Sequence, residues 1–178
     1  MKKNLIILFG AIFILFLGFL FLFATDKSTP QGREASALKT FPDARSCIES
    51  QSETPNTDEL MRMNWSQIKN NAQAKTCMYH ILTALGDVDY ATPWLEAQGF
   101  TSGNTFTSSN PYIGIDDSLN VHANWDVSEN GFRWPETGIK RHILALPIFW
   151  PPYGIHIATS WSSDGKELLY VEINENRL

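Results

Sequence analysis

The chain has 178 residues and a formal net charge of −5, with 43% apolar and 19% charged side chains. This composition is that of a folded protein, and it excludes wholesale intrinsic disorder. After Lys2 and Lys3, nineteen acidic residues face twelve basic ones. The resulting negative net charge argues against a nucleic-acid partner and against adhesion to anionic lipid through a basic patch, because both require a positive surface.

The N-terminal segment is apolar enough to cross a membrane. Residues 4–24 carry no charge and a single polar side chain, and as a helix they would be about 31 Å long, the thickness of a bilayer's hydrocarbon. Lys2 and Lys3 precede them and the next base is Lys27, which keeps the N-terminus in the cytoplasm. The sequence therefore predicts a transmembrane signal-anchor over residues 1–24. It makes the chain a single-pass cell-membrane protein whose remaining part is extracytoplasmic.

A cleavable signal peptide is the alternative to this anchor. Signal peptides have a shorter apolar stretch of about 7 to 15 residues and end in a small-x-small motif. Here the stretch is longer, and Phe23 stands before Ala24 where a small residue is needed. The pattern favours an uncleaved anchor that contacts the lipid bilayer through residues 4–24.

The next segment, residues 25–40, is polar and shows no sustained apolar period. It is typical of a juxtamembrane linker. The length that remains fits one domain over residues 41–178. Pro42 suits the first turn of a short helix over residues 43–50.

Two longer helical segments follow. Asn56 and Glu59 have the spacing of a capping box, which indicates a helix start. Apolar residues then follow one helical face up to residue 72 and the opposite face from residue 74. We therefore expect a break at Asn70 and Asn71, with Asn71 capping the second helix and Gly86 ending it.

A short helix and then strands are expected after residue 91. Thr92 followed by Pro93 predicts the cap and first position of a helix that ends at Gly99. Beyond it, apolar and polar residues alternate over residues 119–126, as in a half-buried strand. Two hairpins are expected, one turning at residues 128–131 and the other at residues 162–165 between strands 155–161 and 168–173. Residues 143–150 are apolar without alternation, which fits an edge strand or a short helix. The expected fold is α+β, with short helices packed on one face of an antiparallel β-meander.

Two histidines are expected on the polar side of this sheet. Adjacent strands could bring His122 and His156 together, and a carboxylate from Asp116, Asp117 or Asp126 could join them for metal binding or acid–base chemistry. His122 and Asp126 are about 13 Å apart along one strand, so neither orients the other directly. The alternative is that all of these are ordinary residues of a solvated sheet face. The sequence assigns no cofactor and no metal.

The two cysteines, Cys47 and Cys77, both follow the apolar leader. An even cysteine count in an exported domain predicts a disulfide between them. Cys77 and His80 also have the spacing of a nucleophile and its base on a helix. Because Cys77 falls on the apolar stripe, the disulfide is the favoured interpretation.

The residues Trp150, Pro151, Pro152 and Tyr153 form a distinctive tract. Two prolines cannot pair within a central strand, so they predict a stiff loop that presents aromatic side chains. Such a loop is a good contact surface for a protein partner or for the face of a sugar. The alternative is that it folds back and covers the core.

Two functions remain open. The anchor, the linker and the lack of a catalytic motif favour a membrane-tethered extracytoplasmic binding or assembly module, periplasmic or extracellular, with a protein partner. The alternative is a small hydrolase or metal-dependent enzyme that uses the sheet face of His122 and His156. Convergence of these histidines with a carboxylate in a concave pocket would favour the enzyme.

Overall fold

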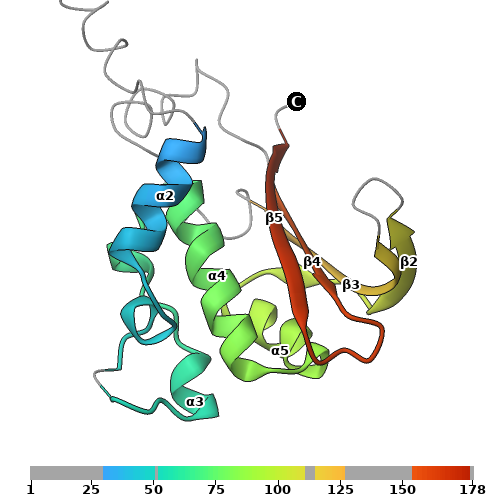
Figure 1. Ribbon diagram of the computed structural model, residues 1–178, viewed down its shortest axis with the longest axis horizontal. Coiled ribbons are helices and arrows are strands. Elements are labelled where there is room, and N and C mark those ends of the chain that lie inside the picture. The colour runs from blue at the N-terminus through green and yellow to red at the C-terminus, as the bar shows by residue number, and fades with distance from the viewer. Residues whose placement is uncertain (1–29, 51, 111–114, 127–153, 177–178) are drawn as a thin grey trace, which may run out of the picture. The chain divides into compact units, whose positions relative to one another are not determined.

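The structure of the protein is a computed structural model that describes residues 30–50, 52–110, 115–126 and 154–176. The chain divides into two units, Met1–Arg33 and Glu34–Leu178. In the second unit, the described residues form an α+β fold with a five-stranded antiparallel sheet and a few short helices (Figure 1). This agrees with the α+β class expected from the sequence.

Among the described residues, no helix is both long and apolar enough to cross a membrane. Residues 1–24, over which the anchor is predicted, lie outside the described ranges. The transmembrane signal-anchor therefore stays a prediction.

The helical elements precede the sheet along the chain. They are α2 (Pro30–Thr40), α3 (Thr57–Leu60), α4 (Asn71–Leu85) and α5 (Ala91–Ala97), with the 3-10 turns η1 (Arg45–Cys47), η2 (Trp65–Gln67) and η3 (Val88–Tyr90).

The first described residues are more helical than the sequence suggests, and the next ones less so. Residues 30–40 of the segment assigned to a linker form helix α2, in which Ala37 is buried and accepts a hydrogen bond from the Phe41 amide at its carbonyl. The helix expected over residues 43–50 is only the single turn η1. It stops because Ile48 leaves the helical region and pairs with Met63 in an isolated β-bridge.

The capping box of Asn56 and Glu59 is confirmed, since each side chain accepts a hydrogen bond from the other's backbone amide. However, the helix that it starts, α3, has one turn, and its expected continuation is wrong. The amide of Asn64 donates to the carbonyl of Cys47 at 2.8 Å, and the amide of Glu49 donates to the carbonyl of Arg62. These long-range hydrogen bonds replace those of a longer helix.

The break before α4 lies where the apolar stripes predict it. The cap is Asn70 and not Asn71, because the Asn70 side chain accepts a hydrogen bond from the Gln73 amide at 3.0 Å. Gly86 ends α4 in the left-handed region with φ of 70°, as predicted. The next helix, α5, begins at Ala91, one residue before the predicted cap Thr92.

The sheet has β1 (Thr101–Ser102), β2 (Phe106–Asn110), β3 (Ile115–Asp126), β4 (Gly154–Trp161) and β5 (Leu168–Asn176). Its order is β1-β3-β4-β5, and β2 also pairs with β3. The alternating strand and the hairpin that turns at residues 162–165 are confirmed. The short polar strands β1 and β2 were not expected, since neither shows an apolar alternation.

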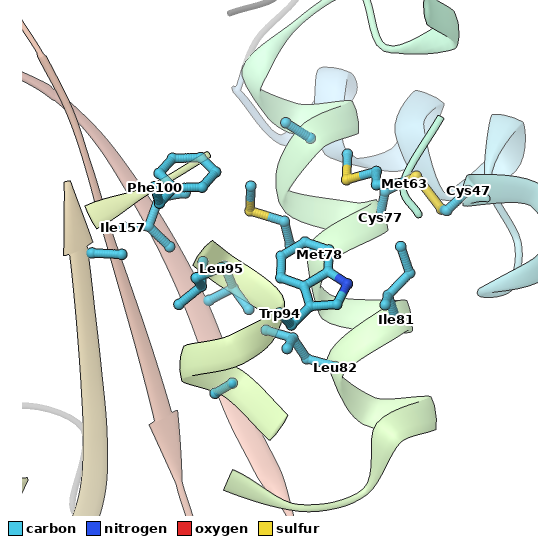
Figure 2. Packing of buried hydrophobic residues seen from close by; sticks show 14 of the residues in the cluster. Cys47, Met63, Cys77, Met78, Ile81, Leu82, Trp94, Leu95, Phe100 and Ile157 are labelled. Atoms are coloured by element: carbon cyan, nitrogen blue, oxygen red, sulfur yellow. A yellow bond between two sulfur atoms is a disulfide. The ribbon is translucent and has the colours of Figure 1, made fainter. Parts of the chain in front are cut away.

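One face of the sheet packs on α4 and α5, and Figure 2 shows Ile157 of the sheet opposite Leu95 and Phe100. Trp94 lies fully buried in this core, and its indole Nε1 donates to the carbonyl of Leu60 at 3.0 Å. From the central strands β3 and β4, this face receives the buried residues Val121, Ala123, Trp125, Ile155, Ile157 and Trp161.

Three of the predicted features lie outside the described residues. They are the hairpin at residues 128–134, the apolar segment 143–150 and the loop Trp150–Tyr153.

Candidate functional site

The second face of the sheet, opposite the core, holds both predicted histidines. In the register of β3 and β4, His122 lies across from Ala158 and Asn124 lies across from His156. Since side chains of alternate residues share a face, the two histidines are diagonal neighbours on it. Each is partly exposed, whereas their neighbours Val121 and Ile157 are buried in the core.

The two imidazole rings are in contact. Their centroids lie 4.9 Å apart and their planes meet at 88°, which is an edge-to-face arrangement. Phe106 of β2 packs on the other side of His122, with centroids 4.8 Å apart and planes at 83°. Phe106 is itself diagonal to His122, because it pairs with Asn120. The three rings therefore form one diagonal row across β2, β3 and β4, the strands seen at the right of Figure 1.

Burial lowers the pKa of His122 below its ordinary value, and the nearby His156 adds to this shift because two protonated rings would repel. Lowering the pKa favours the neutral imidazole, which is the form that accepts a proton or binds a metal ion.

A cluster of small polar side chains adjoins this row of rings. Ser118, Asn120 and Ser160 are 1%, 5% and 1% exposed. The Asn120 amide donates to the Oγ atoms of Ser108 and Ser118, and its oxygen accepts a hydrogen bond from Ser160 Oγ. Ser118 Oγ in turn donates to the Ser108 carbonyl at 2.9 Å. Because these groups satisfy one another, the cluster fixes the strands beside the histidines and does not offer free ligands.

The predicted site is therefore assembled only in part. His122 and His156 come together as expected. Asp117 is exposed and has φ of 57° in β3, while the side chains of Asp116 and Asp126 lie outside the described set. Within that set, no group of three or more His, Cys, Asp or Glu residues could hold a metal ion.

The cysteines form a disulfide, as their number predicts. Cys47 of η1 and Cys77 of α4 are bonded, with Cα atoms 5.3 Å apart, and both are fully buried. A bonded sulfur cannot act as a nucleophilic thiolate, which removes the interpretation of Cys77 and His80 as a catalytic pair. The His80 Nε2 atom is buried and has no hydrogen-bond partner among the described residues.

The residue that sequence reasoning missed is Phe106. It is 41% exposed and lies in a polar tract that shows no strand period. Its one sequence signal is the isolated aromatic side chain in that tract, and this signal does not reveal which strand it pairs with.

No family model matches the chain, and neither the curated proteins nor the solved structures contain a significant match.

Proposed function

We propose that this protein is a single-pass, membrane-anchored binding or assembly module whose folded domain lies outside the cytoplasm. The observation that carries the proposal is the buried disulfide between Cys47 and Cys77. Disulfides of this kind form in oxidising compartments and are rare in the cytosol. Lys2 and Lys3 precede the apolar leader, which favours a cytoplasmic N-terminus and so supports a folded domain on the opposite side of the membrane.

The proposed contact with a protein partner is the tract Trp150, Pro151, Pro152 and Tyr153. It directly precedes β4, which begins at Gly154 and carries His156. Two prolines restrict the backbone before binding, so ordering the loop costs little entropy. Its aromatic side chains supply large contact areas at low rotamer cost.

Photo-crosslinking in cells tests this contact. A photoreactive amino acid at position 150 or 153 should give a discrete adduct with one partner, whereas the same residue at Tyr90, a 40% exposed aromatic on η3, should not. Trp150→Ala should weaken the adduct formed from position 153, and Tyr153→Ala should weaken the adduct formed from position 150. Both substitutions should leave the melting temperature nearly unchanged. A loss of several kcal/mol in the free energy of unfolding would instead identify the loop as part of the core. Equal adducts at all three positions would contradict a specific contact.

A further inference from the structure

We infer that His122 and His156 form a binding site for a borderline divalent transition-metal ion, such as Cu²⁺, Zn²⁺ or Ni²⁺, that leaves further coordination positions of the ion open. This goes beyond the proposed function, since it concerns the sheet face and does not depend on an anchor or on a partner. The ring nitrogens of histidine are the commonest protein ligands of these ions.

The separation of the rings is the first argument. A metal ion lies about 2.0 to 2.1 Å from a coordinating imidazole nitrogen, which places it about 3.2 Å from the ring centroid. Two rings that share one ion at an angle between 90° and 109° therefore have centroids about 4.5 to 5.2 Å apart. The observed 4.9 Å between His122 and His156 falls inside this interval. The ring planes meet edge to face at 88°, so one ring must turn about its own side-chain torsions before both nitrogens point at one ion.

The backbone supplies the second argument, which is preorganisation. The two histidines lie in the paired part of β3 and β4, whose register runs without a shift from Leu119 to Asp126. Two residues flank the diagonal between the rings: Ala158, opposite His122, carries only a methyl group, and Asn124, opposite His156, is exposed. Phe106 packs against the far side of His122 and limits its rotation. An ion would therefore order few additional torsions on binding.

The ligand set decides which ions fit. Two imidazole nitrogen ligands suit Cu²⁺, Zn²⁺ and Ni²⁺, while Mg²⁺ and Ca²⁺ prefer oxygen ligands. The order of affinities for such a site places Cu²⁺ above Ni²⁺ and Zn²⁺. Because four-coordinate ions need four ligands, two positions are left for water or for a donor group from another molecule.

Titration of the full-length chain in detergent micelles with Cu²⁺ tests this inference. Electron paramagnetic resonance should show one Cu²⁺ per chain with hyperfine structure from two imidazole nitrogens. His122→Ala and His156→Ala should each weaken Cu²⁺ binding at least about tenfold, since even the loss of a group that only orients a ligand costs about 10- to 100-fold. His80→Ala, on α4 outside the site, is the matched control and should bind as the wild type does.

Each variant's circular dichroism and melting temperature show whether it is folded. A folded His122→Ala or His156→Ala chain that keeps wild-type affinity and the two-nitrogen spectrum would overturn the inference. A wild-type chain that binds Cu²⁺ no more tightly than a chain carrying both His122→Ala and His156→Ala would also overturn it. If either alanine variant unfolds, His122→Gln and His156→Gln, which keep a polar side chain on the sheet face, take its place under the same criteria.

Discussion

Gly165 attaches the hairpin of β4 and β5 to the helical part of the domain. It has φ of 73°, and its carbonyl accepts a hydrogen bond from the Val88 amide at 2.8 Å. Lys166, next in the chain, forms an ion pair with Asp87. A Cβ atom at position 165 would lie 2.6 Å from the Val88 side chain. Both the backbone conformation and the packing therefore require glycine at this position.

We expect Gly165→Ala to lower the free energy of unfolding by about 2 to 4 kcal/mol, through backbone strain and overpacking against Val88. Gly103→Ala is the control, since the nearest atom to its new Cβ is the His122 carbonyl oxygen at 3.6 Å and its φ is not positive. This control should change stability by less than about 1 kcal/mol. Chemical denaturation of both variants provides the comparison, and equal stabilities would contradict the docking of the turn on η3.

The shared polar face of the two histidines was predictable from the sequence, and their aromatic neighbour was not. The alternation around His122 and around His156 places both side chains on that face, but the pairing of β3 with β4 that brings them together joins distant parts of the chain. Phe106 belongs to a strand whose pairing depends on long-range contacts that no local pattern records. The same holds for the buried cluster around Asn120, because asparagine and serine in a strand ordinarily indicate exposure.

At the start of helix α4, two adjacent asparagines have different roles. Asn70 has extended backbone angles and its side chain caps the Gln73 amide, while Asn71 is the first helical residue. The apolar stripes locate the break between two helical segments, but they do not determine which asparagine leaves the helical region.

Asn70→Ala should therefore destabilise the protein by about 1 kcal/mol, the usual loss when a helix cap is removed. Asn71→Ala should cost less than Asn70→Ala, because it leaves the capping side chain of Asn70 in place. Thermal unfolding of the two variants measures the difference. A larger loss for Asn71→Ala than for Asn70→Ala would show that the cap lies one residue later.

Helix ends were more predictable than helix lengths for a physical reason. The capping box of Asn56 and Glu59 and the left-handed Gly86 depend on neighbours within a few residues and were found from the sequence, whereas the caps of α4 and α5 were predicted one and two residues too late. The lengths of η1 and α3 are set by the pairing of Ile48 with Met63, which are fifteen positions apart in the sequence. The apolar periodicity alone predicts that the helix starting after Asn56 continues, whereas the pairing of Ile48 with Met63 interrupts it.

At the scale of the whole molecule, the disulfide links η1 to the central helix α4. Its cysteines are separated by 30 positions. On the chain-entropy account, closing a loop of that length stabilises the folded state by about 3 to 4 kcal/mol. The bond also restrains the segment whose carbonyl at Cys47 accepts the Asn64 amide.

The double variant Cys47→Ala with Cys77→Ala should lose about 3 to 4 kcal/mol of unfolding free energy. Thiol labelling of denatured, unreduced wild-type protein from its native compartment should detect no free cysteine. Urea unfolding of the wild type with and without reductant gives an independent measure of the same loss. Two labelled thiols per chain would contradict both the bond and the compartment that it indicates.

Protease accessibility in sealed right-side-out membrane vesicles tests most directly the proposal that the domain is membrane-anchored and extracytoplasmic. The chain carries one tag before Lys2 and another after Leu178. We predict that external protease removes the C-terminal tag and leaves the N-terminal tag on a short membrane-bound fragment that becomes digestible only when the vesicles are opened. A C-terminal tag that survives until the vesicles are opened would place the domain in the cytoplasm and contradict the proposal.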